Sequence, residues 1–100
     1  MQKKVVLELQ YFRGCPNSLE VLNMLRSFVK KYKGDIVYRE RLIETEKSAL
    51  EFNFRGSPTI LINGVDLEDL PVPDKPGLTC RIYQEGLPTE EKILAKIRKL

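Results

Sequence analysis

The sequence predicts an α/β domain with a four-stranded mixed sheet and three flanking helices, in the order strand, helix, strand, helix, strand, strand, helix. Apolar residues alternate along residues 4–12, recur at helical spacing along residues 19–32, and flank an Asn63-Gly64 hairpin signal. A helical crossover between the first two strands implies that they pair in parallel, whereas the hairpin makes the last two strands antiparallel.

The first strand and the first helix are separated by a short turn. The strand is expected over residues 4–12, with alternate apolar residues on one face. Gly14 ends it, and Pro16 suits the first turn of a helix, where a missing N–H costs nothing. The helix is expected to begin at Leu19 and to end at Gly34, after a last turn rich in lysine.

A second strand and a short helix follow. The strand is expected over residues 35–43, and its charged centre suits an edge position in the sheet. Thr45 is expected to cap a helix that runs to about Asn53. Within that helix, Ala49 and Leu50 are expected to face inward.

The remaining elements complete one domain, residues 1–100, because a chain of this length buries a single core. Residues 59–62 predict a third strand, and residues 65–70 after the hairpin predict a fourth. Residues 71–79 hold three of the six prolines and predict a loop. The last helix is expected to begin near Thr89, with acidic residues in its first turn and basic residues in its last.

Composition excludes several functional classes. The 17 basic and 14 acidic residues leave a net charge of +3, which is too small and too scattered for nucleic-acid binding. No apolar run approaches the roughly 20 residues of a membrane span, and no export signal is evident, so we expect a cytoplasmic protein without membrane contact. The absence of histidine excludes hydrolases that use a Cys-His or Ser-His-Asp arrangement. Two cysteines cannot form a four-thiolate zinc site within one chain.

Cys15 lies directly before the proline that opens the first helix. The first turn of a helix presents unpaired N–H groups and the positive end of the helix dipole, and both stabilise a thiolate. A free cysteine has a pKa near ~8.5, which helix N-termini and nearby cations lower to ~3.5–7.5. Arg13 is a candidate cation. Placement on a turn favours an exposed, reactive thiol over a small core residue, which is the ordinary alternative.

Three short motifs occur in a recognisable order. A strand ends at residues 11–12, Cys-Pro-Asn-Ser at residues 15–18 opens a helix, and Gly-Ser-Pro-Thr at residues 56–59 opens a strand that turns at residues 63–64. This order resembles the thioredoxin and glutaredoxin superfamily. More narrowly, it resembles small bacterial and archaeal thioredoxin-like proteins, some of them selenoproteins, which have a Cys-Pro-Asn active site and a later Cys-Arg-x-Tyr segment, here residues 80–83. The resemblance covers the whole chain and implies a thioredoxin-like fold with the order βαβαββα.

The resemblance implies roles for individual residues. Cys15 takes the position of the attacking thiol, and Pro58 takes that of the cis-proline beside it. The Ser57 carbonyl and the Thr59 backbone are then expected to face a substrate, which pairs there like an added strand. Without the resemblance, Pro58 would be interpreted as an ordinary trans-proline at the start of a strand.

The chain departs from the thioredoxin pattern at two positions. Ser18 replaces the second cysteine, and Leu9 stands where thioredoxins carry a buried acid, with Glu8 adjacent. A mixed disulfide on Cys15 is therefore resolved either by glutathione or another small thiol, or by Cys80, whose preceding loop returns to the same sheet edge. For Cys80, a core thiol and a static disulfide are the alternatives. Ser18 is a candidate hydrogen-bond donor to the Cys15 thiolate or a plain first-turn residue.

The sequence thus predicts a thiol-dependent redox protein of the thiol–disulfide oxidoreductase type. It would act on a disulfide-containing protein or a small thiol and would need no cofactor beyond a co-substrate such as glutathione. Arg55 is expected either to attract an anionic substrate or to stay solvated. Two other functions remain open: a module whose thiolates bind mercury, copper or arsenite, and an interaction domain whose edge strand at residues 39–41 meets a protein partner.

Overall fold

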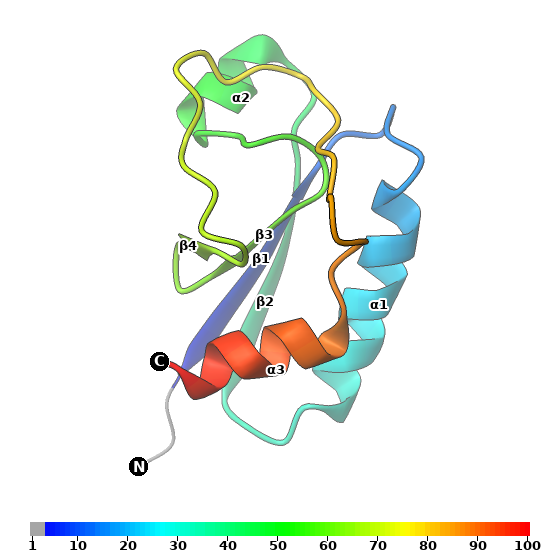
Figure 1. Cartoon of the computed structure of the whole chain (residues 1–100), viewed down its shortest axis with the longest axis vertical. Helices are drawn as coiled ribbons and strands as arrows, with labels where there is room; N and C mark the ends of the chain where they lie inside the picture. The colour runs from blue at the N-terminus through cyan, green and yellow to red at the C-terminus, as the bar shows by residue number, and fades with distance from the viewer. Residues whose placement is uncertain (1–3) are drawn as a thin grey trace.

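A computed structural model describes residues 4–100 and shows a four-stranded mixed sheet with three helices (Figure 1). Along the chain, the elements are β1 (Val5–Tyr11), α1 (Ser18–Lys31), β2 (Ile36–Leu42), α2 (Glu46–Glu51), β3 (Thr59–Ile62), β4 (Val65–Asp66) and α3 (Glu90–Arg98). Across the sheet, the strand order is β2-β1-β3-β4. The predicted α/β class, the mixed sheet and the order of the elements are confirmed.

β1 is a central strand, and it determines where the other segments lie. It pairs in parallel with β2, with Leu7 opposite Tyr38, and antiparallel with β3, with Leu7 opposite Ile62. β3 and β4 form the expected hairpin, in which Asn63 and Gly64 adopt φ angles of 51° and 81°. Because β3 runs opposite to β1, the end of β1 and the beginning of β3 lie at the same edge of the sheet.

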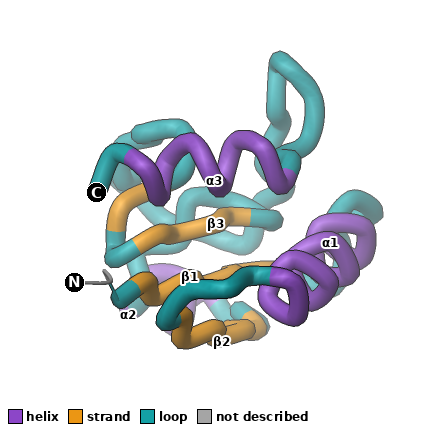
Figure 2. Tube along the Cα trace, turned by 90° about the horizontal axis from the view of Figure 1, so that it is seen from below, coloured by secondary structure: helices purple, strands orange, loops and turns teal. Residues whose placement is uncertain are grey.

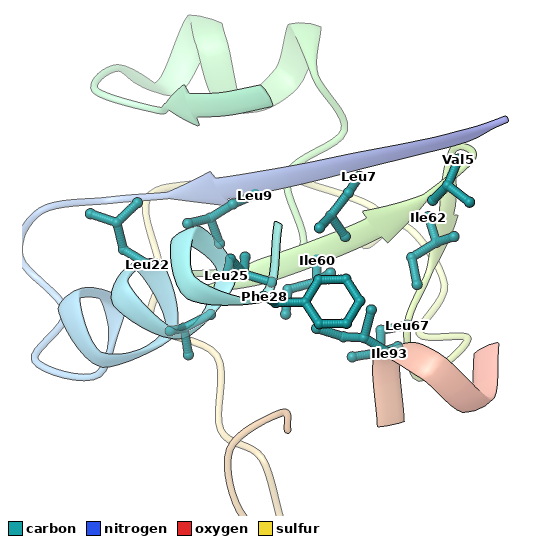
Figure 3. Close-up of a cluster of buried hydrophobic side chains, with 11 residues drawn as sticks. Val5, Leu7, Leu9, Leu22, Leu25, Phe28, Ile60, Ile62, Leu67 and Ile93 are labelled. Carbon is teal, nitrogen blue, oxygen red and sulfur yellow. The ribbon is translucent and has the colours of Figure 1, made fainter. Parts of the chain in front are cut away.

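The main core lies between the sheet and two helices, α1 and α3 (Figure 3). α3 begins beside the end of α1, where Lys31 and Glu90 form an ion pair of 2.9 Å (Figure 2). Burying one large apolar side chain contributes roughly 1.5–3 kcal/mol. The buried residues of this core are Val5, Leu7, Leu9, Val21, Leu22, Leu25, Phe28, Ile60, Ile62, Leu67 and Ile93.

α1 is an amphipathic helix of 14 residues that directs one apolar stripe at the sheet. It begins at Ser18, one residue before the expected start. It ends at Lys31, earlier than the expected end at Gly34, because Tyr32 already adopts an extended backbone. Among residues 4–100, none of the helices has the length and hydrophobicity that a bilayer crossing requires.

α2 packs into a second, smaller cluster of apolar residues. Thr45 caps the helix as expected, since its hydroxyl accepts a backbone N–H of the first turn at 3.0 Å. Ala49 is fully buried in this cluster beside Phe54. Leu50 is 57% exposed, so the prediction that it faces inward is wrong. Adjacent helical residues point roughly 100° apart, and Ala49 already occupies the centre of the narrow buried stripe.

β4 is much shorter than the strand predicted over residues 65–70. The Asp66 carboxylate accepts the backbone N–H groups of Glu68 and Leu70, both at 3.0 Å. The N–H of Asp69 donates to the Asp66 carbonyl, also at 3.0 Å. These local bonds compete with strand pairing and turn the chain away from the sheet after two residues.

β2 lies at one edge of the sheet, as its charged centre predicted. Glu40 forms a salt bridge of 2.7 Å with Arg26 on α1, and this hydrogen-bonded guanidinium lowers the pKa of Glu40 below its usual value. Arg39 and Arg41 lie 3.7 and 3.4 Å from the carboxylate of Glu8 on β1. The charged side chains of this edge strand therefore interact within the molecule.

Leu25→Ala should lower the free energy of unfolding by about 2–5 kcal/mol, because it leaves a cavity in the main core. Leu50→Ala removes the same atoms from an exposed position and should change that free energy by no more than about 0.5 kcal/mol. Urea unfolding of both variants, followed by circular dichroism without reductant, measures the difference. Equal losses for the two variants would contradict the exposure of Leu50.

Candidate functional site

Cys15 and Cys80, 65 residues apart in the sequence, form a disulfide with their Cα atoms 5.6 Å apart. Cys15 lies in the turn between β1 and α1. Cys80 belongs to residues 79–83, here named the Cys80 segment, which follows the proline-rich loop and runs down beside α1 (Figure 1). The fold therefore brings together the two cysteines that the sequence singled out.

The two cysteines differ in exposure. Cys15 is only 4% exposed, whereas Cys80 lies at the surface. The expectation of an exposed Cys15 is thus wrong for the bridged protein, in which the disulfide joins this residue to the Cys80 segment. Cys15 nevertheless lines an open cleft of about 310 Å³. The other residues of the cleft are Tyr11, Arg13, Pro16, Ser18, Leu19 and Leu22.

The start of α1 is arranged to favour negative charge near Cys15. The carbonyl of Cys15 accepts the N–H of Ser18 at 3.2 Å, so the sulfur-bearing residue lies immediately before the first helical turn. Asn17, at the N-cap position, makes no side-chain capping hydrogen bond. The positive end of the helix dipole therefore has no capping side chain at Asn17.

Ser18 interacts with Ser57 rather than with Cys15. Both serines are buried, and their hydroxyl oxygens lie 2.6 Å apart. The Ser57 hydroxyl also accepts the backbone N–H of Phe12 at 2.8 Å, which ties this pair to the end of β1. Of the two roles considered for Ser18, a donor to the Cys15 thiolate and a plain first-turn residue, the first concerns the reduced protein; in the bridged protein the Ser18 hydroxyl contacts Ser57. Ser18 instead connects α1 to the residue before Pro58.

The Ser57–Pro58 peptide bond is cis, as the resemblance implied. The main chain of Ser57, however, does not face a substrate. Its N–H donates to the carbonyl of Thr79 at 2.9 Å, and its carbonyl accepts the N–H of Arg81 at 2.8 Å. Both groups are used by the Cys80 segment, so the expectation that Ser57 offers them to a substrate is wrong for this state.

Thr59 also serves the fold. Its main chain lies in register with Gln10 of β1, inside the sheet. Its hydroxyl donates to the carbonyl of Gly56. The prediction that the Thr59 backbone faces a substrate is therefore wrong, because the main chain of Thr59 pairs with β1.

A buried ion pair between Asp66 and Arg81 is the main feature that sequence reasoning missed. The guanidinium donates two hydrogen bonds to the carboxylate, at 2.6 and 2.9 Å, and the two side chains are 5% and 1% exposed. Burial by itself would raise the pKa of Asp66, but the Arg81 guanidinium and two backbone N–H groups hold it below its usual value. The sequence signal was Arg81 itself, which was noted within the Cys-Arg-x-Tyr motif but given no role.

Tyr83 extends this arrangement toward Pro58. Its hydroxyl donates to the carbonyl of Pro58, and its ring lies under the Arg81 guanidinium, 4.6 Å from ring centre to cation. Burial raises the pKa of Tyr83 above its usual value, so the phenol stays protonated and remains a donor. The Cys80 segment is therefore attached to the cis-proline loop by side chains as well as by its backbone.

Three other candidates lie away from the disulfide. Arg55 donates to the carbonyl of Leu70 at 2.8 Å and so holds a loop. Leu9 is buried in the main core, so an apolar side chain stands at the position where thioredoxins carry a buried acid. Glu8 is on the opposite face of β1 and accepts a hydrogen bond of 2.7 Å from Gln10.

The soft-metal alternative depends on the same two sulfur atoms. Within residues 4–100, no group of three or more cysteine or acidic residues is placed to hold a metal ion. In the bridged protein both sulfurs are bonded to each other, so a two-thiolate site would require prior reduction.

The chain matches no protein-family model, and no curated protein shows significant similarity to it. The resemblance to thioredoxin-like proteins therefore rests on the motifs and on the arrangement described above.

Asp66→Asn should lower the free energy of unfolding by about 3–5 kcal/mol at neutral pH, because it leaves the Arg81 charge buried without its partner. The folded protein holds the pKa of Asp66 below its unfolded value, so the contribution of this carboxylate is present above the unfolded pKa. That contribution is lost as the pH falls through the folded pKa. The difference between the wild type and the variant should consequently shrink on acidification. Urea unfolding at pH 7 and at pH 2 tests this, and a constant difference would count against the ion pair.

Proposed function

We propose that this protein is a thiol–disulfide oxidoreductase with a thioredoxin-like fold, in which Cys15 is the attacking thiol and Cys80 the resolving thiol. The observation that carries the proposal is the meeting of these two cysteines, 65 residues apart, at the opening of α1 and beside the cis-proline loop. A helix start stabilises a thiolate, and a second thiol within bonding reach replaces the missing Cys at position 18.

The geometry supports a two-step exchange centred on the sulfur of Cys15. In the reduced protein, the Cys15 thiolate attacks one sulfur of a substrate disulfide and releases the other as a thiolate. Cys80 then loses its proton to solvent and attacks the Cys15 sulfur, which expels the second substrate thiolate and closes the bridge. Two electrons pass from the protein to the substrate, and a thiol reductant later reopens the bridge.

The surroundings of the two cysteines suit a bridge that opens and closes. Cys15 lines an open cleft of small-molecule size, which offers a route toward its sulfur. Cys80 lies at the surface, so its thiolate can leave into water. A disulfide enclosed in the core would offer neither route. This contrast favours a reactive pair over a static structural link.

The two cysteines should behave differently when replaced singly. Cys15→Ser should abolish exchange with glutathione disulfide, because it removes the attacking thiolate. Cys80→Ser should still react once and should then accumulate a stable adduct of glutathione on Cys15, because nothing resolves it. Mass spectrometry of the intact protein after acid quenching distinguishes the two results. An adduct that forms equally fast on Cys80 in the Cys15→Ser variant would overturn the assigned roles.

The helix start should keep Cys15 reactive in mild acid. Between pH 8 and pH 6, the alkylation rate of a thiol with a pKa near 8.5 falls roughly 75-fold. For Cys15, measured with iodoacetamide in reduced Cys80→Ser, the fall should be less than tenfold. Cys80, measured in reduced Cys15→Ser, serves as the control. If both thiols lose reactivity by the same factor, α1 does not activate Cys15.

A further inference from the structure

The Cys80 segment occupies the place that a strand-forming substrate would take. It pairs with Ser57 as a parallel β-bridge, through one hydrogen bond from Ser57 N–H and one to the Ser57 carbonyl. A substrate that adds a strand at this position needs the same two groups. As long as the segment stays bound, an extended polypeptide has no main-chain partner there.

Arg81 holds the segment in this position. Its guanidinium reaches across to Asp66, and the pair is almost fully buried. The same carboxylate accepts the N–H groups of Glu68 and Leu70, which fix the Asp66 end of the pair. A bidentate arginine–carboxylate pair fixes orientation as well as distance. Cys80 directly precedes Arg81 in the chain, so the ion pair holds Cys80 beside Ser57 and near Cys15.

Gly56 makes this close approach possible. It adopts a φ angle of +100°, and a Cβ atom added there would lie 3.0 Å from the Cβ of Arg81 and 3.2 Å from its backbone nitrogen. A side chain at position 56 would push the Cys80 segment outward. The cis-proline loop and the segment are thus fitted to each other.

None of these contacts involves a sulfur atom. The β-bridge, the ion pair and the hydrogen bond from Tyr83 to Pro58 all form between atoms other than those of the disulfide. Reduction of the bridge removes none of the atoms that form them. The segment should accordingly remain in place in the reduced protein, which is the form that attacks a substrate.

We infer that the Cys80 segment is an internal strand that closes the Ser57 edge to polypeptides, so that the substrates of Cys15 are low-molecular-weight disulfides. In this arrangement Arg81 and Asp66 are positioning residues. They act through Cys80, which they hold near Cys15, and through Ser57, which they keep occupied. The inference rests on the proposed function and adds its substrate class.

The cleft beside Cys15 agrees with that class. Its volume of about 310 Å³ lies at the lower end of the ~300–1,000 Å³ typical of small-molecule sites. Its wall is mostly apolar, with Arg13 as its cation. The balanced reaction is that of the proposed function: the protein dithiol and one small disulfide give the protein disulfide and two small thiols. A second small thiol, used twice, returns the protein to the dithiol.

The test compares two probes that carry the same leaving group. One is the mixed disulfide of thionitrobenzoate with N-acetylcysteinamide, and the other is its mixed disulfide with a strand-forming decapeptide that has one central cysteine. Release of thionitrobenzoate reports the attack by Cys15 on each probe. Each rate is divided by the rate of the same probe with dithiothreitol, so that only selection by the protein remains.

The reduced wild type should react at least tenfold faster with the single-residue probe. Cys80→Ser should keep this preference, because the segment is held without its sulfur. Arg81→Lys keeps the charge but loses the bidentate geometry, and the preference should fall below threefold. Arg26→Lys is the matched control, since it changes the exposed bidentate pair with Glu40, and it should retain the wild-type preference. Both variants are assayed where circular dichroism shows them fully folded, because an unfolded thiol would react with both probes without preference.

Each outcome separates the inference from the proposed function. If wild-type Cys15 reacts equally with both probes, the internal strand does not exclude polypeptides and the inference fails, while the oxidoreductase proposal stands. If Arg81→Lys keeps the full preference, the ion pair does not position the segment, and the role assigned to Arg81 is overturned. If Cys15 reacts with neither probe, the proposed function and the inference fail together.

Discussion

Ser57 joins three segments that are far apart in the chain. Its hydroxyl accepts the N–H of Phe12 at the end of β1 and lies 2.6 Å from the hydroxyl of Ser18 at the start of α1. Its main chain pairs with Thr79 and Arg81. A buried polar group without a partner costs about 1–3 kcal/mol, so the loss of any one of these contacts would destabilise the fold. Through this residue the turn before α1 and the Cys80 segment, which carry the two cysteines, contact the same point of the fold.

Elements with strong local signals were predictable from the sequence. Alternation marked β1, the Asn63-Gly64 pair marked the hairpin, Thr45 caps its helix as expected, and α3 begins close to Thr89 as expected. Where a side chain redirected its own backbone, prediction failed. The Asp66 carboxylate captures two nearby N–H groups and shortens β4, and the β-strand pattern of the sequence does not reveal that competition.

The candidate site was predictable in part, for the same reason. The position of Cys15 at a helix start is a local property and was visible in the sequence. The partner of Ser18, the burial of Cys15 and the pairing of Asp66 with Arg81 depend on segments that meet only in the folded chain. A buried ion pair leaves no periodic pattern, because each of its members is a single charge in a different loop or strand.

The disulfide also has a consequence for the unfolded chain. It closes a loop between residues 65 positions apart, which is most of the chain. In the chain-entropy account, a cross-link over a loop of this size removes enough freedom from the denatured ensemble to favour the native state by roughly 4 kcal/mol. Folding and disulfide formation are two sides of one thermodynamic cycle. The native conformation therefore favours formation of the disulfide by the same free energy, compared with an unfolded chain. Oxidation state and resistance to denaturation are thus linked quantities, and a change in the redox potential of the surrounding solution would alter both.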